Sequence, residues 1–237
     1  MNNILRNFLI TEEQLKFLQK YYTINEDIDE MAYPASFNME EFKNCNSFAA
    51  RVRYCQARLP RISSGSSRIV YKIDDEKVLK LAKNAKGVAQ NNTEAYSYAI
   101  ETGIGAQVFD HDENDLWLEM ELARRATAAD FKNIVGVPFA FIQNYVDYTA
   151  KRYSRNMFIS YDRRYKEMFE QIDNEDFPNW EWFSGLRDYM DGTSLETVGD
   201  LKRPSSWGVV KRNGADEIVL IDFGLDDEVY DNFYRRR

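Results

Sequence analysis

The residues Glu217-Ile218-Val219-Leu220-Ile221-Asp222-Phe223-Gly224-Leu225 decide the fold that this sequence predicts. Their apolar run predicts a buried strand that carries Asp222 at its end, before Phe-Gly turns the backbone away. A carboxylate that is fixed on a rigid strand and free at its tip suits the chemistry of a metal–phosphate complex. Only 15 residues follow Asp222 (237 − 222), so we expect its partners to come from the preceding sequence.

The composition predicts a soluble globular protein, because 44% of the residues are hydrophobic, 30% are charged and 14% are aromatic. The formal net charge of −8 disfavours non-specific binding to nucleic acid or to an anionic membrane, and we expect neither as a partner. No apolar run reaches the roughly 18 residues of a membrane span. The N-terminus lacks a secretory signal, so we expect a cytoplasmic location.

Histidine and cysteine are too scarce for several kinds of site. The only histidine, His111, stands in a polar turn and predicts a solvated loop residue rather than a member of a triad or of a multi-histidine metal site. Cys45 and Cys55 share one helical pattern, which favours reduced core residues over a disulfide. Two thiols cannot close a zinc site by themselves.

Residues 1–60 predict helices. Thr11 and Gln14 resemble a capping box for a first helix. A second helix is predicted from Asn38 to Leu59, before Pro60. Its apolar stripe predicts a face packed on the rest of the protein, with a surface for a partner as the alternative. The stripe consists of Phe42, Cys45, Phe48, Ala49, Val52, Cys55 and Leu59.

The remainder predicts strands, then helices, then a hairpin. Strands are expected at 68–73, 77–82, 107–109, 116–120, 208–210 and 218–221, and helices at 88–101, 139–153 and 180–190. The turns are Asp74-Asp75-Glu76 and Asn213-Gly214. This order lacks regular β-α-β alternation and predicts an α+β fold. We expect a helical extension at 1–60, a sheet lobe at 61–123 and a helical lobe at 124–237.

Lys80 is polar inside the apolar strand Val78-Leu79-Lys80-Leu81-Ala82. Glu94 follows 14 residues later (94 − 80) on the next predicted helix, and a helix packed on the sheet brings the two charges together. Either charge alone would be costly to bury, so the two make sense as a pair. The same lysine is able to hold phosphate oxygens.

Two loops complete the set of polar segments. Ser63-Ser64-Gly65-Ser66-Ser67 joins two strands with small residues whose N–H groups are able to approach a phosphate, although a plain turn explains it equally well. Asp200 opens a loop that contains Lys202 and hydroxyl side chains, 22 residues before Asp222 (222 − 200). One carboxylate could orient a hydroxyl nucleophile while the other holds Mg²⁺.

The order of these motifs resembles the protein-kinase-like fold. A Gly-containing hairpin, Val-Leu-Lys, a helical Glu, a strand into a connector, Asp-Leu-Lys and Ile-Asp-Phe-Gly follow one another from Arg61 to Leu225. Within that family, the chain looks most like the small kinase-like proteins of bacterial virus genomes. The resemblance implies a mostly antiparallel N-lobe sheet and a reduced, truncated helical C-lobe.

The resemblance also implies roles for individual residues, with ATP and Mg²⁺ as cofactors. Gly65 and Ser66 cover the phosphates, and Lys80 holds the α- and β-phosphates while paired with Glu94. Backbone groups of Glu121 and Ala123 contact adenine. Asp200 is the catalytic carboxylate, and Lys202 contacts the γ-phosphate. Asp222 is the first metal ligand, and Ser205 is the second, or Ser206 if the loop is one residue longer.

Several departures from the family's pattern keep three functions open. Val198-Gly199 stands where the family has His-Arg, serine replaces the usual asparagine ligand, and no Ala-Pro-Glu follows. The first function is an ATP- and Mg²⁺-dependent phosphotransferase that acts on a protein, of the host or of a virus. The second is a catalytically inactive pseudokinase that serves as a binding module. The third is an interaction or structural protein, for example within a virion, that uses the helix Met39–Leu59 and the tail Arg235–Arg237.

Overall fold

The computed structural model describes residues 33–153, 159–172, 174, 176–193 and 198–235. Five antiparallel strands form the first sheet: β1 (Arg61–Ser64), β2 (Arg68–Lys72), β3 (Lys77–Ala82), β4 (Val108–His111) and β5 (Trp117–Glu121). A second sheet contains β6 (Arg124–Arg125), β7 (Trp207–Arg212) and β8 (Ala215–Leu220). The α-helices are α2 (Met39–Lys43), α3 (Phe48–Arg58), α4 (Ala85–Ala95), α5 (Tyr98–Glu101), α6 (Ala128–Asp130), α7 (Phe139–Tyr153), α8 (Lys166–Gln171), α9 (Trp180–Gly192), α10 (Val198–Leu201) and α11 (Asp227–Phe233).

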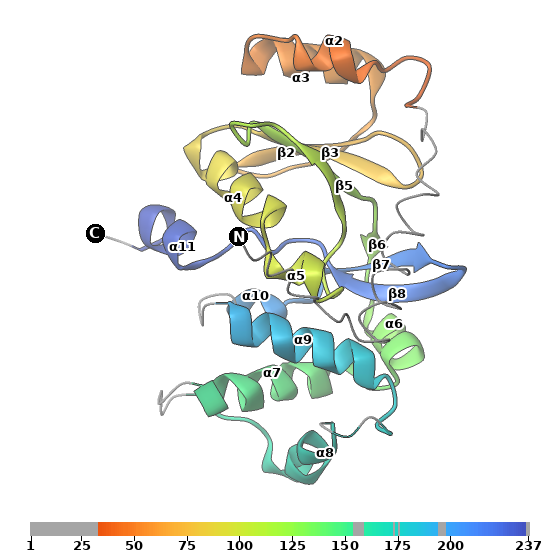
Figure 1. The fold of residues 1–237 in the computed structure, drawn as a ribbon, viewed down its shortest axis with the longest axis vertical. Coiled ribbons are helices and arrows are strands. Elements are labelled where there is room, and N and C mark those ends of the chain that lie inside the picture. Colours follow the sequence, from red (N-terminus) through yellow and green to blue (C-terminus); the bar gives the residue numbers. More distant parts are fainter. Residues whose placement is uncertain (1–32, 154–158, 173, 175, 194–197, 236–237) are drawn as a thin grey trace, which may run out of the picture.

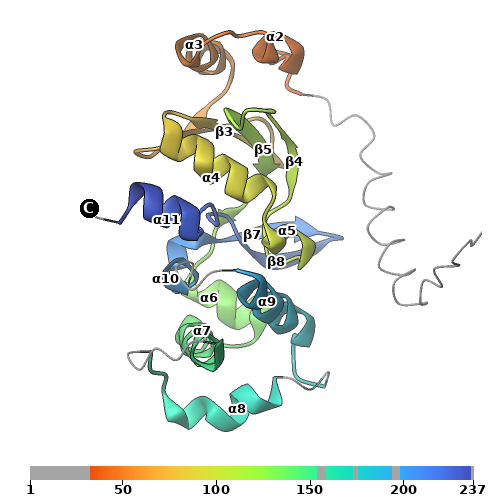
Figure 2. The same ribbon diagram turned by 60° about the vertical axis from the view of Figure 1, so that its left-hand side comes forward.

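These elements lie in layers along the long axis of the molecule. Helices α2 and α3 cover one face of the five-stranded sheet, and α4 covers the other (Figures 1 and 2). The three-stranded sheet follows, and α7, α8 and α9 form the opposite end (Figure 1). The arrangement confirms the α+β class. The capping box expected at Thr11 and Gln14 lies outside the described residues.

The five-stranded sheet has the order β1-β2-β3-β5-β4. The β2–β3 hairpin pairs Val70 with Lys80, and β3 pairs Lys80 with Leu118 on β5. Asp74 makes the expected turn tight, since its carboxylate accepts the N–H groups of Glu76 and Lys77. Lys80 therefore stands on a central strand with partners on both sides.

Strand alternation sorts the side chains of β2 and β3 onto two faces. Ile69, Tyr71, Leu79 and Leu81 pack in one buried cluster with the aromatic and aliphatic side chains of residues 37–59. Val78 belongs to the other, larger cluster, which continues into the helical end of the molecule. Lys80 shares the face of Val78 and is therefore directed at the rest of the protein rather than at α3.

The single helix expected from Asn38 to Leu59 is wrong, because the chain breaks between α2 and α3. Asn38 caps α2 as expected, by accepting the N–H of Glu41. Ser47 then caps α3 through the N–H of Ala50, which starts a new helix. The apolar stripe is therefore discontinuous: Phe42 and Cys55 are buried on the sheet, whereas Phe48 is exposed.

The helix expected at 88–101 also consists of two helices. It begins earlier, at Ala85, because Asn84 caps it through the N–H of Gly87. Ser97 interrupts it, since its side chain accepts the N–H of Ala99 and starts α5. His111 is not a loop residue either: it ends β4 and is half-buried.

The β7–β8 hairpin brings Asp222 to the five-stranded sheet. Asn213 and Gly214 have φ of 52° and 80°, as the expected tight turn requires. At the end of β8, the N–H of Leu220 donates to the carbonyl of Ile104 at 2.7 Å, and Leu220 accepts the N–H of Ala106 at 2.8 Å. These two hydrogen bonds fix the end of β8 to the segment between α5 and β4.

The helices in the described ranges are too short or too polar to cross a membrane.

Candidate functional site

The expected pair of Lys80 and Glu94 is present and buried. The ammonium of Lys80 donates to Glu94 Oε2 at 2.8 Å and to the carbonyl of Ile221 at 2.9 Å. Lys80 thereby joins β3, α4 and the residue directly before Asp222. Gly87 lets α4 approach this closely, because a Cβ there would lie 2.2 Å from the carbonyl oxygen of Ser67.

Arg68 is a functional candidate that the sequence analysis missed. Its guanidinium contacts Glu94 Oε2 through Nη1 at 2.7 Å and Asp222 Oδ1 through Nη2 at 3.0 Å. The side chain of Arg68 is only 10% exposed. Arg68 shares the Lys80 face of the sheet, because β2 pairs Arg68 with Ala82 and Val70 with Lys80. A charged residue on that face of an apolar strand was the signal that could have identified it.

Burial and the neighbouring charges together set the pKa values of Glu94, Lys80 and Arg68. Burial alone would raise the pKa of Glu94, but the adjacent Arg68 and Lys80 outweigh burial and hold it below its usual range. Burial lowers the pKa of Lys80, and Glu94 opposes that effect. For Arg68, the carboxylates of Glu94 and Asp222 outweigh burial and raise the pKa. Glu94 is therefore ionised and stabilises two cations.

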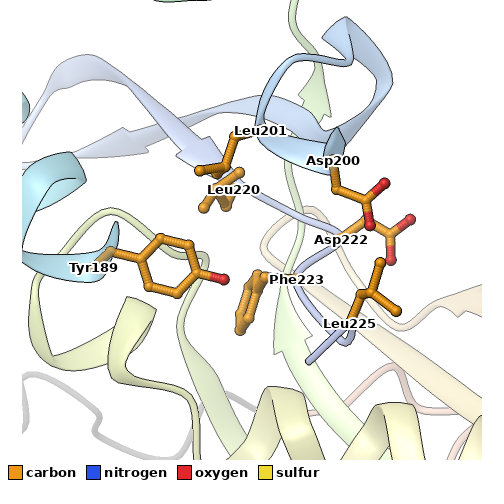
Figure 3. Close-up of a pocket in the computed structure, with 7 residues that line it drawn as sticks. All are labelled: Tyr189, Asp200, Leu201, Leu220, Asp222, Phe223 and Leu225. Carbon is orange, nitrogen blue, oxygen red and sulfur yellow. The ribbon is translucent and has the colours of Figure 1, made fainter. Parts of the chain in front are cut away.

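Asp200 and Asp222 line one pocket, as expected. Their carboxylates lie side by side at its edge, with Tyr189, Phe223 and Leu225 around it (Figure 3). Burial raises the pKa of Asp200, while its ion pair with Arg203, at 2.9 Å, opposes that rise. The side chain of Asp222 is 61% exposed. The pocket itself holds about 10 Å³, room for about one water molecule.

Lys202 is directed elsewhere. Its ammonium lies 2.8 Å and 2.9 Å from the carboxylate oxygens of Asp147 on α7, and its side chain does not line the pocket of Asp200 and Asp222. Ser205 lies in an exposed turn. Ser206 is buried and accepts the N–H of Ile221 through its carbonyl at 2.8 Å. Of the two serines, Ser206 is therefore the one that is hydrogen-bonded to the residue before Asp222.

The loop of Gly65 and Ser66 joins β1 to β2 above the start of α4. Gly65 closes the turn by donating its N–H to the carbonyl of Arg68 at 2.9 Å. Lys83 donates to the carbonyl of Gly65 at 2.7 Å, and Lys86 donates to the hydroxyl of Ser66 at 3.0 Å. Two lysines therefore stand beside a loop that was expected to cover phosphates.

Glu121 and Ala123 lie where the two sheets meet. The N–H of Glu121 is already donated to the carbonyl of Gln107, and its carboxylate binds Arg212 at 2.6 Å. Ala123 packs against Gly208 on β7, where an added Cβ would lie 2.5 Å from the Cβ of Ala123. Their expected contacts with adenine stay a prediction.

Comparisons with known proteins give only distant similarities. No family model and no curated protein matches the chain. Five chains of solved structures match. One is a choline/ethanolamine kinase family protein from Mesorhizobium loti, with 11% identity over 78% of this chain and 64% of that chain, and a TM-score of 0.31.

Two further similar structures are complexes. The streptomycin–ATP complex of APH(2")-IIa has 14% identity over 76% of this chain and 71% of that chain, with a TM-score of 0.31. The GDP and kanamycin complex of APH(2")-IIia has 12% identity over 70% of this chain and 66% of that chain, with a TM-score of 0.30. The chain thus spans about two thirds of the length of these structures. At TM-scores this low, the similarity says nothing about function.

The donor set at the pocket is suited to Mg²⁺ that is shared with phosphate. Mg²⁺ sites of this kind use one or two carboxylates, and substrate phosphates and water complete the coordination. Asp200 and Asp222 supply two carboxylates on one pocket, and Ser206 lies at the neighbouring backbone. Within the described residues, no group of three or more His, Cys, Asp and Glu side chains could hold a metal by itself. Water molecules or the phosphates of a ligand would complete the coordination.

Proposed function

We propose that this chain is a kinase-like phosphotransferase that uses ATP and Mg²⁺. One observation carries the proposal: the buried pair of Lys80 and Glu94 is hydrogen-bonded to the backbone at Ile221, next to a pocket lined by Asp200 and Asp222. A lysine ammonium near two carboxylates is suited to phosphoryl transfer, in which cations hold the phosphates and carboxylates hold the metal and orient the nucleophile. The exposed Asp222 carboxylate would be the metal ligand, with Ser206 favoured over Ser205 as its neighbour.

Each residue then has a chemical task. Lys80 would bind phosphate oxygens while Glu94 keeps its ammonium in place. Asp200 would accept the proton of an acceptor hydroxyl, since its carboxylate lines the pocket beside Asp222. Bound Mg²⁺ supplies neutralisation of charge on the phosphates. The expected role of Lys202 at the γ-phosphate requires that it leave Asp147.

The acceptor that we propose is a hydroxyl group of a protein, of the host or of a virus, as the resemblance of the motifs implies. The assay for it combines ATP labelled at the γ-phosphate with the protein alone and with a bacterial lysate. A parallel reaction offers choline, ethanolamine, streptomycin and kanamycin, so that label in a small molecule rather than in a protein identifies a different acceptor class.

A second candidate function is a pseudokinase that binds a partner without transferring phosphate. Two observations favour it: Arg68 binds the exposed carboxylate of Asp222, and the pocket holds only about 10 Å³. Nucleotide binding has to separate Arg68 from Asp222 and open this pocket. If those contacts persist, the cleft is a structural connection between the two sheets.

Thermal unfolding with ATP and Mg²⁺ tests the proposal. At a ligand concentration of about 100 times Kd, binding stabilises the folded state by about 2.7 kcal/mol. For a chain of this size, that gain raises Tm by roughly 5–10 °C. Asp222→Asn is expected to abolish the rise, because it removes the metal ligand. Asp216→Asn, an exposed carboxylate on β8, is the matched control and should respond like the wild type.

The outcomes separate the two candidate functions. A rise in Tm together with transfer of label supports the phosphotransferase. A rise without transfer to any acceptor favours the pseudokinase. If ATP leaves Tm unchanged, both with and without Mg²⁺, the result contradicts a nucleotide site. It favours a protein that acts only through its surfaces.

A further inference from the structure

Arg68 is unusual because it places a second buried cation on one buried carboxylate. Lys80 and Arg68 both contact Glu94 Oε2, at 2.8 Å and 2.7 Å. The exposed fractions of the three side chains are 8%, 10% and 0%. One glutamate neutralises only one of the two positive charges. The remaining positive charge is costly in a buried site unless another anion compensates it.

Asp222 is the anion that compensates Arg68. The guanidinium reaches from Glu94 to Asp222 Oδ1, at 3.0 Å, and so bridges two carboxylates that lie on different elements. Arginine suits this position because its planar group presents several donors in fixed directions. The proposed function assigns the same carboxylate to Mg²⁺. The positive charge of the guanidinium at Oδ1 opposes the binding of a divalent cation to that carboxylate.

We propose that Arg68 makes metal binding at Asp222 conditional on a phosphate-bearing ligand. The inference rests on the proposed function of the cleft. Without a nucleotide, the guanidinium holds Asp222 and weakens the binding of a divalent cation. A bound triphosphate supplies new negative charge for Arg68, which releases Asp222 to the metal. Arg68 is thus a determinant of metal affinity rather than a catalytic residue.

The size of the effect follows from competition within the molecule. Suppose that the metal binds only molecules in which Asp222 is free of Arg68. Its apparent Kd then equals the intrinsic Kd divided by the fraction of such molecules. If Arg68 holds Asp222 in about nine-tenths of the molecules, the Kd for the metal alone is raised roughly tenfold. Removal of the guanidinium should therefore lower the Kd for the metal by the same factor.

Titration of the protein with Mn²⁺ alone tests the inference, with the signal of free Mn²⁺ in electron paramagnetic resonance as the readout. Arg68→Met is expected to bind Mn²⁺ with a Kd roughly tenfold lower than the wild type. The double variant Arg68→Met/Asp222→Asn should lose this gain, because the gained ligand is the carboxylate. Arg68→Lys keeps a cation beside Glu94 but lacks the fork that spans both carboxylates, and it should show a similar gain.

Lys77→Met is the matched control. Lys77 is also a buried cation of this sheet, paired with Glu119 at 2.9 Å, but β3 alternation places it on the opposite face, with Leu79 and Leu81. Its removal should leave Mn²⁺ affinity unchanged. A gain in Lys77→Met equal to that in Arg68→Met would indicate general loosening of the sheet and would overturn the inference.

Addition of ATP gives the second readout. In the presence of ATP, the wild type should bind Mn²⁺ within about threefold of Arg68→Met, since phosphate then replaces Asp222 as the partner of Arg68. Equal or weaker Mn²⁺ binding by both Arg68 variants without ATP overturns the inference. If ATP changes the Tm of neither the wild type nor Arg68→Met, the result contradicts the proposed function instead. Failure of the inference and failure of the proposed function are therefore distinguishable.

Discussion

At the scale of single residues, Glu94 is the centre of the buried charges. It contacts two cations, and both of them also contact the segment of Ile221 and Asp222. Lys80 and Arg68 therefore connect the five-stranded sheet to the end of β8 only while Glu94 holds them. The sequence identified Lys80 and Glu94, whereas the position of Arg68 between two carboxylates became evident from the structure.

Removal of the shared carboxylate should cost more than removal of one cation. Glu94→Gln leaves Lys80 and Arg68 buried without their common anion, and we expect a loss of roughly 3–5 kcal/mol in the free energy of unfolding. Lys80→Met leaves Glu94 paired with Arg68, and we expect a loss of about 1–2 kcal/mol. Urea denaturation measures both. Equal losses would mean that Arg68 does not share the charge of Glu94.

At the scale of elements, α4 holds the site together because it lies unusually close to the β1–β2 turn. Gly87 permits this contact with Ser67, and the hydroxyl of Ser67 donates to the side chain of Gln90 one turn later, at 2.6 Å. The end of the helix is then fixed by Glu94. The α4 helix is thus positioned at its start by backbone contact and at its end by charge.

Gly87→Ala should destabilise the protein although alanine is the better helix former. The added Cβ would lie 2.2 Å from the backbone oxygen of Ser67, so α4 or the turn has to move, at a cost of about 1–3 kcal/mol. Gly199→Ala in α10 is the matched control, because an added Cβ meets nothing within 4 Å. That substitution should be neutral or stabilise by up to about 1 kcal/mol. Thermal unfolding of the two variants checks the opposite signs.

At the scale of the whole molecule, the two sheets form one unit. The larger buried cluster runs from Val78 and Met120 in the five-stranded sheet to Phe183 in the helical end. Arg212 on β7 adds a polar connection, since it binds Glu121 and donates to the carbonyls of Gly103 and Gly105. We therefore expect unfolding in one cooperative transition.

Arg212→Met should weaken the connection between the sheets. It leaves the half-buried carboxylate of Glu121 without its cation, and we expect a loss of roughly 2–4 kcal/mol in the free energy of unfolding. Lys211→Met, the exposed neighbour on β7, should change stability by less than about 0.5 kcal/mol. Circular dichroism and tryptophan fluorescence measure both variants. Separate transitions by the two methods would contradict a single cooperative unit.

The sequence by itself determined six of the eight strands, all but β1 and β6, together with the α+β class and the paired charges of Lys80 and Glu94. These features depend on side-chain period, on turn residues and on the cost of a lone buried charge, all of which are local. The two broken helices were missed because Ser47 and Ser97 cap new helices where the apolar spacing continues.

Only the tertiary structure decided which charges meet after the end of β8, at Asp222. It brought Asp222 to Asp200, as expected, but it also brought Arg68 to Asp222 and directed Lys202 to Asp147. Arg68 and Asp222 are 154 residues apart, and no local pattern relates their side chains. The packing of α4 on the sheet and the β8 contact with Ile104 and Ala106 fix their distance. The strand predicted an available metal ligand, and the folded chain supplies that ligand with a cation of its own.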